Sequence, residues 1–343
     1  MKKIKYFFLT VLMLGLCCVV LSWTSLFMSN VSLSVNGAEY LYVPTGSNYY
    51  DLIGLIDKKS CCKNKRLFRI ASTIKRFSRV KPGRYRLVNG MNYNLLINHL
   101  RLGLQEPVEL SLIGIHTKGQ LAGRLGRKLE IDSLAIEKWL REDKYWMNYK
   151  YLNVENRLCF FIPKIYTVDW NIQLNELLHQ MDREYNKVWT KERFQKASRL
   201  NLTIPEVIIL ASIVESEQTR FDDEKPIIAG LYLNRLKKNM FLQSDPTVVY
   251  ATGNFALNRV LNVDKQIDSP YNTYLSKGLP PGPICLPEIS SIDAVLNPRS
   301  HEYLYMCAKD DFSGKHNFAS SLEMHNHYAK LYRKALDKHN IRR

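Results

Sequence analysis

The stretch ASIVESEQTR, residues 211–220, places two carboxylates at the end of an apolar run. Glu215 follows Ile213 and Val214 directly, and Glu217 comes two residues later. A carboxyl group in poorly hydrated surroundings has a raised pKa, and a general acid that works near neutral pH needs one. The alternative is a helix that ends in two solvated acids. Spacing alone leaves both interpretations open.

The residues before Glu215 predict a helix that carries this acid on an apolar face. Thr203 and Glu206 form the T-x-x-E pattern of a capping box, and Pro205 is tolerated in a first turn. One stripe of this helix holds Ile208, Ala211, Ser212 and Glu215. Glu217 points about 200° away around the helix. The two acids therefore share a pocket only if the helix ends between them.

Composition favours an anionic partner. The chain has 343 residues and a formal net charge of +17, with Lys and Arg spread along most of it after Lys58. This length allows one large domain or two modest ones with an ample core. A basic balance suits nucleic acid, a membrane surface or an anionic polymer. Nucleic acid is disfavoured, because we find no aromatic-basic signature and no zinc-finger spacing.

The N-terminus predicts a single membrane anchor. Residues 6–28 contain no charged side chain, and at ~1.5 Å per residue this segment can cross a bilayer core of roughly 30 Å. Three lysines precede the segment, and no Lys or Arg follows until Lys58. The positive-inside bias then keeps residues 1–5 in the cytoplasm and exports the rest. A cleaved signal peptide is the alternative, although no small-x-small site closes the apolar run cleanly.

The seven cysteines do not form the pattern of a disulfide framework. Two lie in the membrane segment, and Cys61 and Cys62 are adjacent. The remaining three, Cys159, Cys285 and Cys307, are far apart and are predicted to be buried thiols. The absence of a C-x-x-C pattern leaves zinc knuckles and thioredoxin-type sites without support.

Periodicity predicts a small α+β module over residues 30–125, a mostly helical region over 126–200 and a second block over 201–343. In the first module we expect strands at 31–43, 81–88 and 107–115, a helix that ends at Gly103, and a short helix at 117–129. In the last block Asp245 precedes Pro246 and is expected to be a helix N-cap. A strand at 302–308 and a basic terminal helix are expected to follow.

A loop at residues 269–284, SPYNTYLSKGLPPGPI, is dense in Tyr, Asn, Pro and Gly. It places Tyr271, Asn272, Thr273 and Tyr274 side by side, which offers stacking faces together with hydroxyl and amide groups. A sugar needs both kinds of contact, although an ordinary surface loop has the same composition.

The block after residue 201 resembles a known family. The matching segments are LASIVESE, IIAGLYLNRLKKNMFLQSDPTVVYATG, SPYNTYLSKGLPPGPI, YLYMCA and HNF, in this order. They resemble the endolytic murein transglycosylases of the MltG, or YceG-like, family. The resemblance implies an α+β fold with an N-terminal transmembrane helix at 6–28, a LysM-like subdomain at 30–125, a mostly helical connecting region at 126–200 and a mixed α/β catalytic domain at 201–343. The acid lies on a helix of the catalytic domain.

This resemblance implies cleavage of the β-1,4 bond after N-acetylmuramic acid inside nascent peptidoglycan strands. Glu215, in the SIVE motif, is the expected acid, and its carboxylate then helps remove the C6 hydroxyl proton of the same sugar. A 1,6-anhydro end results. Ordinary glycosidases use two carboxylates, whereas the internal hydroxyl makes one sufficient here. The reaction requires no cofactor and no metal.

The resemblance also assigns supporting residues. The residues expected to line the sugar cleft are Gln243, Ser244, Asp245, Tyr271, Asn272 and Tyr274, while Glu217 and Asn234 are expected to support the site. The alternative reverses the two acids, so that Glu217 is the catalytic one and Glu215 supports it. The chain departs from the family pattern G-x-x-F-P-D-T-Y before the catalytic block, because it has Lys164–Ile165 where relatives have Asp-Thr. The role of this altered segment around Pro163 is left open.

Two other classes of protein are considered. One is a catalytically weak, membrane-anchored peptidoglycan-binding protein that uses the cleft only for docking. The other is a zinc peptidase built on His316, His325 and His327, which the absence of H-E-x-x-H disfavours. The expected partners are peptidoglycan strands, anionic lipid headgroups and peptidoglycan synthases. The expected location is the cytoplasmic (inner) membrane, with the catalytic domain outside the cytoplasm.

Overall fold

The computed structural model describes residues 2–28, 31–33, 38–62, 64–257 and 259–339. Part of the strand predicted at 31–43 lies outside these residues. Helices and short two-stranded sheets make up the chain, so the predicted α+β class is confirmed. The chain divides into two compact units. Unit 1 comprises residues 1–110, 126–132 and 167–173, and unit 2 comprises residues 111–125, 133–166 and 174–343.

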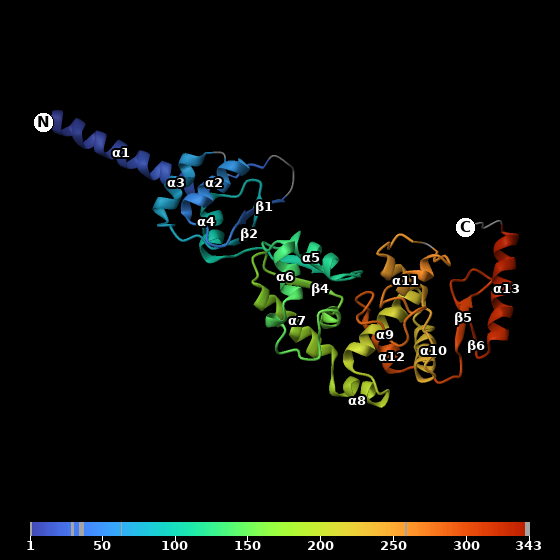
Figure 1. Ribbon diagram of the computed structural model, residues 1–343. Coiled ribbons are helices and arrows are strands. Elements are labelled where there is room, and N and C mark those ends of the chain that lie inside the picture. Colours follow the sequence, from blue (N-terminus) through green and yellow to red (C-terminus); the bar gives the residue numbers. More distant parts are fainter. Residues whose placement is uncertain (1, 29–30, 34–37, 63, 258, 340–343) are drawn as a thin grey trace. The chain divides into compact units, whose positions relative to one another are not determined.

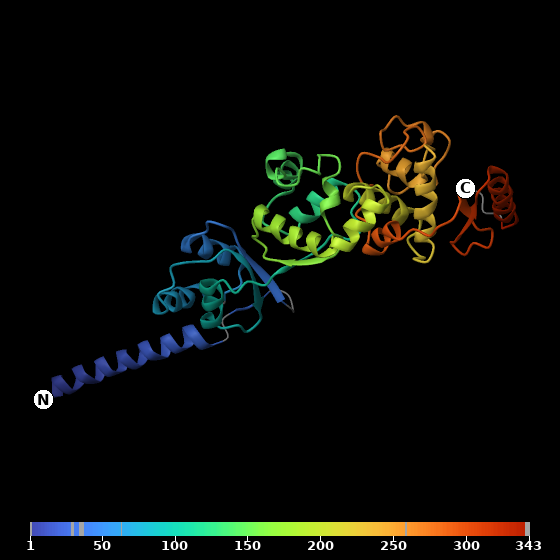
Figure 2. The ribbon, with the colours of Figure 1, turned by 90° about the horizontal axis from the view of Figure 1, so that it is seen from below.

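Helix α1, Lys2–Phe27, carries the apolar N-terminal run and is visible in both ribbon views (Figures 1 and 2). Its most apolar 18-residue stretch has a mean hydropathy of 2.3, and its apolar side chains are exposed until the last turn. Within the described part of the chain, α1 alone is long and apolar enough to cross a membrane; α8 and α9 qualify only as a pair bent by 81°. Because α9 is buried in protein, we regard it as a core helix.

Unit 1 is built around the hairpin of β1, Ala38–Val43, and β2, Gly83–Val88. The strands pair antiparallel from Ala38 opposite Val88 to Val43 opposite Gly83. Its helices are α2 (Tyr49–Lys59), α3 (Lys65–Ile74) and α4 (Tyr93–Leu102). Each begins at an asparagine whose side chain accepts backbone N–H groups. Helix α4 ends at Gly103 with φ of 75°, as predicted.

The first part of unit 2 is mostly helical. Its elements are α5 (Lys118–Gly126), α6 (Ser133–Arg141), η1 (Asp143–Tyr145), η2 (Arg157–Phe160), α7 (Leu174–Val188) and α8 (Lys191–Arg199). Strands β3, Val108–Ser111, and β4, Ile165–Val168, form a second sheet, whose residues are divided between unit 1 and unit 2. In the altered segment Lys164 forms an ion pair with Glu184 at 2.7 Å, and Ile165 begins β4.

Helix α9, Ile204–Glu217, carries both candidate acids in its last turn. The predicted capping box is confirmed: the Thr203 hydroxyl accepts the Glu206 N–H, and the Glu206 carboxylate accepts the Thr203 N–H at 2.7 Å. Every residue from Ile204 to Val214 except Glu206 is buried, as expected for a helix that is apolar all round. It packs against α10, Lys225–Lys237, and α12, Ile289–Leu296 (Figures 1 and 2).

Two further expectations are corrected in this unit. Helix α11 is Asp245–Thr252, so Ser244 occupies the N-cap position and the prediction for Asp245 is wrong by one residue. Cys159 and Cys285 are buried as predicted, whereas Cys307 is only half-buried. All cysteines are free thiols. A short helix, η3 (Asp264–Gln266), precedes the loop at 269–284.

The C-terminal part of unit 2 is a hairpin and a helix. Strands β5, Tyr305–Ala308, and β6, His316–Ala319, pair antiparallel. Helix α13, Leu322–Lys338, packs on both strands (Figure 2). The strand and the terminal helix are therefore confirmed, although β5 is shorter than the segment predicted for it.

Candidate active site

The two acids of α9 open into different cavities of unit 2. Glu215 lines a cavity of about 780 Å³ with many apolar neighbours. Glu217 lines a second cavity of about 250 Å³, whose other members include Tyr232, Gln243 and His316. Asp245 lines both cavities. The separation agrees with the predicted difference in direction between the two side chains.

Glu215 is held by a cation. Its Oε2 accepts a hydrogen bond from Lys225 Nζ at 3.2 Å and another from the Ser291 hydroxyl. The Lys225 side chain is 2% exposed and also pairs with Asp222 at 2.8 Å. Burial lowers the pKa of Lys225, but the Asp222 and Glu215 carboxylates outweigh burial and hold that pKa above its ordinary value. Glu215 therefore faces a permanent positive charge.

Glu217 has neutral partners instead. Its Oε1 accepts the Ser244 hydroxyl at 2.6 Å and the Tyr232 hydroxyl at 2.7 Å. Burial raises the pKa of Glu217, and these two hydrogen bonds lower it only in part. Among the described residues no cation forms an ion pair with Glu217. The pKa of this carboxyl group is therefore shifted in the direction that a general acid near neutral pH requires.

The distribution of hydrogen bonds on Glu217 indicates which oxygen carries the proton. Both hydroxyls donate to Oε1. An oxygen that already accepts two hydrogen bonds is a poor position for the acidic proton, so the proton belongs on Oε2. Glu217 thus combines a raised pKa with a proton that is not committed to either neighbouring hydroxyl.

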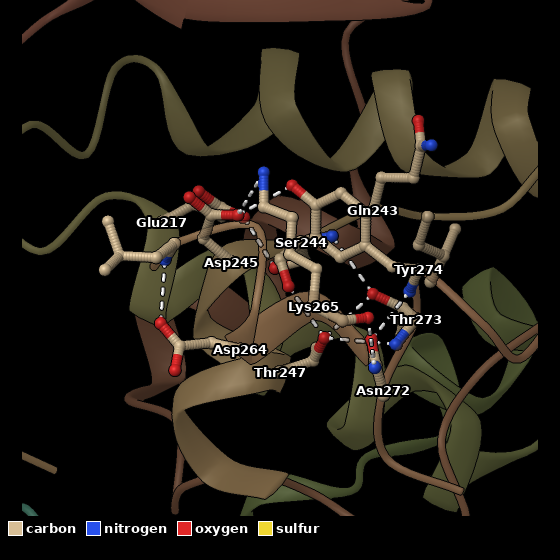
Figure 3. Close-up of polar contacts among 12 residues, drawn as sticks. Glu217, Gln243, Ser244, Asp245, Thr247, Asp264, Lys265, Asn272, Thr273 and Tyr274 are labelled. Atoms are coloured by element: carbon tan, nitrogen blue, oxygen red, sulfur yellow. Dashed lines mark hydrogen bonds and ion pairs between the residues drawn. The ribbon is translucent and has the colours of Figure 1, made fainter. Parts of the chain in front are cut away.

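The segment before α11 places three predicted site residues around Glu217 (Figure 3). The Ser244 hydroxyl donates to Glu217, which explains why this N-cap makes no side-chain bond to its own helix. Asp245 Oδ1 accepts the Tyr274 hydroxyl at 2.6 Å and lies 3.7 Å from Lys265 Nζ. Gln243, at φ of 50°, lines the same cavity.

The loop at 269–284 contributes Tyr274 to this cavity, but its other two predicted residues have different surroundings. Asn272 is fully buried, and its Nδ2 donates to the carbonyls of Lys265 and Ile267 at 3.0 and 2.9 Å (Figure 3). Its Oδ1 accepts the Tyr274 N–H at 3.0 Å. Tyr271 packs on Tyr250 with ring centroids 4.5 Å apart. Asn272 therefore braces the loop that presents Tyr274.

Asn234 has a bracing role as well, because its Nδ2 donates to the His301 and Tyr303 carbonyls at 2.8 and 3.2 Å. The six residues expected in the cleft therefore fall into two groups, of which only one lies at the cavity of Glu217. Those that line the cavity of Glu217 or contact this acid are Gln243, Ser244, Asp245 and Tyr274. In the described structure none of the six forms a hydrogen bond or ion pair with Glu215, although Asp245 lines its cavity.

Sequence reasoning missed Lys225, Ser291, Tyr232 and the active-site position of His316. Ser291 is 76 residues from Glu215, and no local pattern connects them. Lys225 and Tyr232 lie on the same face of α10, at i and i+7. This spacing was the one signal in the sequence that could have connected them. In the described part of the chain, no group of three His, Cys, Asp or Glu side chains could hold a metal.

Comparisons with known proteins agree on one family. The model of the YceG-like family matches residues 41–331. The endolytic murein transglycosylase of Bacillus subtilis is 30% identical over 310 residues, which cover 84% of this chain and 83% of that protein. The enzyme of the same name from Streptococcus pneumoniae strain D39 is 29% identical over 329 residues, and the chain spans only 59% of its length.

A solved structure gives the same result. The crystal structure of a putative YceG-like protein from Listeria monocytogenes is 26% identical and superimposes with a TM-score of 0.58. The match covers 84% of this chain and 98% of the Listeria chain. The family match covers well over half of the sequence, and the fold agrees with it. The chain therefore belongs to the YceG-like family.

Proposed function

We propose that this protein is a membrane-anchored endolytic lytic transglycosylase of peptidoglycan. It cleaves the β-1,4 bond between N-acetylmuramic acid and N-acetylglucosamine within nascent strands and leaves 1,6-anhydro-muramic ends. The relatives from Bacillus subtilis and Streptococcus pneumoniae carry the name endolytic murein transglycosylase. The observation that carries the proposal for this chain is a carboxyl group with a raised pKa in a cavity lined by polar side chains.

Glu217 is the proposed acid. Oε2 of Glu217 gives its proton to the glycosidic oxygen while C1 of the muramic acid takes on oxocarbenium character. The Ser244 and Tyr232 hydroxyls then stabilise the carboxylate that forms, at 2.6 and 2.7 Å from Oε1. Glu215, which the SIVE motif favours, remains the alternative. Its ion pair with Lys225 stabilises a carboxylate before the reaction as well as after it, which is less useful for an acid.

The polar residues around Glu217 suit a sugar. Gln243 offers an amide and Tyr274 an aromatic face beside the acid, and carbohydrate recognition uses both kinds of group. The larger cavity, which shares Asp245 with the smaller one, extends the surface available to a strand that runs through the site. An endolytic enzyme needs such an extension, because its substrate continues on both sides of the broken bond.

The remaining proposals concern location. We place α1 in the cytoplasmic membrane, with residues 1–5 inside and the catalytic unit outside, and we assign a LysM-like glycan-binding role to the module at 30–125. The net charge of +17 suits peptide-stem carboxylates and anionic lipids. From this position we infer that the protein acts beside peptidoglycan synthases. Membrane fractionation and the N-terminal sequence of the mature protein test it, since a protein that starts after α1 would mean a cleaved signal sequence.

The test of the activity uses full-length protein in detergent with uncrosslinked glycan strands and mass spectrometry of the products. We expect anhydro ends, one water lighter than hydrolysed ends. Glu217→Gln should lower their formation by about 10³-fold, because general acids contribute about 10²–10⁴ in rate. Glu215→Gln is the matched variant from the same helical turn and should retain much more activity.

Each other outcome has a definite meaning. If Glu215→Gln is the inactive variant, the acid is the residue that the sequence motif favours. Hydrolysed ends from the wild type would make the protein a muramidase that needs a second carboxylate. Strand binding without any cleavage would support the glycan-binding protein, the second candidate.

A further inference from the structure

His316 occupies the cavity of Glu217 in the geometry of an oriented base. It begins β6 and lines this cavity. Its Nδ1 lies 3.0 Å from Glu224 Oε2, and its backbone N–H donates to Glu224 Oε1, also at 3.0 Å. The Glu224 side chain is only 6% exposed. One buried carboxylate therefore fixes both the backbone and the ring of His316.

The carboxylate also fixes the tautomer. A carboxylate beside Nδ1 requires a proton there, which leaves Nε2 as the hydrogen-bond acceptor of a neutral imidazole. Within the described residues, Nε2 has no hydrogen-bond partner. The same arrangement of a buried carboxylate, an imidazole and a free ring nitrogen orients the base of hydrolytic triads. The Nε2 atom of His316 is thus able to accept a proton.

A hydrogen-bonded chain links this base to the acid. Gln218 directly follows Glu217, and its Nε2 donates to Glu224 Oε2 at 2.8 Å. The Gln218 amide is fixed further by the Gly314 carbonyl at 3.1 Å and by the Arg220 N–H at 3.1 Å. The end of α9 and the start of β6 are therefore held together through Glu224. This link places Glu217 and His316 in one cavity from segments about one hundred residues apart.

We propose that His316 is the base that accepts the C6 hydroxyl proton of muramic acid while Glu217 acts as the acid, a role that rests on the proposed function. The C6 oxygen attacks C1 as the bond from C1 to the glycosidic O4 breaks. Glu217 Oε2 gives its proton to O4 of the departing N-acetylglucosamine, and His316 Nε2 takes the C6 proton. The new bond from O6 to C1 closes the anhydro ring, and no water is consumed.

Proton transfer from His316 back to Glu217 restores both groups for the next cycle. After the bond breaks, the cavity holds an imidazolium beside two carboxylates, Glu224 and Glu217. Opposite charges within one cavity stabilise the pair that the reaction creates. Arg235 and Asp245 are the other charged residues that line the cavity. A guanidinium has no acceptor atom and cannot serve as the base, and that of Arg235 donates to the carbonyls of Leu304, Phe241 and Leu242.

Chemical rescue tests the proposal on the full chain in detergent. His316→Ala should form anhydro ends at least about 100-fold more slowly, the usual contribution of a positioned base, while its affinity for glycan strands stays close to wild type. Added imidazole should restore part of the rate. His301→Ala is the matched control, because both of its ring nitrogens contact backbone groups; imidazole should not change its rate.

Glu224→Gln tests the orienting carboxylate. We expect a lower kcat with an unchanged KM, because the amide keeps the shape but no longer enforces the tautomer. Near wild-type activity in His316→Ala would overturn the proposal and leave Glu217 as acid and base in turn. If His316→Ala loses both its activity and its glycan binding and does not respond to imidazole, the proposal is also overturned, and His316 has a structural role. Hydrolysed ends from the wild type would instead refute the proposed function itself.

Discussion

Glu215 and Glu217 stand in the same helical turn, yet their surroundings differ in almost every respect. Glu215 faces a large, mainly apolar cavity and is held by the ammonium group of Lys225. Glu217 faces a small polar cavity and is held by two hydroxyls. Each acid meets one residue of α10, Lys225 for Glu215 and Tyr232 for Glu217. Their other partners come from different segments, Ser291 on α12 and Ser244 just before α11.

This contrast shows that burial alone does not produce an acid. A desolvated carboxyl group keeps its proton only if no cation offsets the cost of its charge. Glu217 meets that condition, and its pKa is raised by burial. Glu215 has a buried lysine within 3.2 Å, which favours a structural anion that ties α9 to α10 and α12. The following predictions test this division.

The largest expected effect concerns the structural anion. Lys225→Met should destabilise unit 2 by about 3 kcal/mol, because it leaves Glu215, whose side chain is 16% exposed, without its cation. Thermal unfolding followed by circular dichroism measures the change. Lys187→Met is the control, since Lys187 forms an exposed ion pair with Glu184 at 2.7 Å and should cost less than about 1 kcal/mol. Equal effects of the two variants would contradict the structural role of Glu215.

Local sequence signals were sufficient for the elements that hold the acids. The capping box at Thr203 and Glu206 and the glycine that ends α4 depend on residues within one turn, so the sequence displays them directly. The N-cap of α11 was missed by one residue. Ser244 and Asp245 both suit that position, and only tertiary contact reveals that the Ser244 hydroxyl is bound to Glu217 instead.

The different electrostatic surroundings of the two acids could not be predicted from the sequence, for another reason. Spacing predicts that the two side chains point apart, but the partner that each one meets comes from distant segments. Tyr232 and Lys225 lie on α10, and His316 begins β6. The assignment of the cleft residues and the subdomain boundaries stay predictions. For Asn272, the family motif indicated an important residue without distinguishing a ligand from a loop brace.

A smaller effect concerns the ionisation of Glu217. The Ser244 hydroxyl stabilises its carboxylate and lowers its pKa, so Ser244→Ala should raise that pKa further. Because the protonated form is active, the alkaline decline of activity should move to higher pH. At a given pH on that limb, Ser244→Ala should retain a fraction of its maximal activity that is up to about tenfold higher than the fraction retained by the wild type. This factor corresponds to ~1.4 kcal/mol, the contribution of one hydrogen bond to a charged group.

The control for this pH profile is Ser216→Ala. Ser216 lies between the two acids, and its hydroxyl donates to the Ser212 carbonyl at 2.8 Å rather than to Glu217. Its alkaline limb should coincide with that of the wild type. An unchanged limb in Ser244→Ala would mean that another group controls the decline, and the acid would have to be sought elsewhere.

The smallest effect is the pH dependence of stability. Since the folded-state pKa of Glu217 is raised above its unfolded value, its protonation stabilises the fold at acidic pH, and this contribution is lost as pH rises through the folded pKa. Glu217→Gln lacks the titration and keeps an acceptor for both hydroxyls. Its free energy of unfolding, relative to the wild type, should therefore increase as pH rises from the unfolded-state pKa of Glu217 through its raised folded-state pKa.

Glu184 provides a control of opposite sign for this measurement. Hydrogen bonds from Lys164 and Lys187 lower the pKa of Glu184, so its carboxylate stabilises the fold above the unfolded pKa and this contribution disappears as pH falls through the folded pKa. Glu184→Gln should therefore lose stability relative to the wild type as pH rises. If the free energies of unfolding of both variants change in the same direction with pH, a cation governs the ionisation of Glu217. The distinction between the two acids of α9 then does not hold.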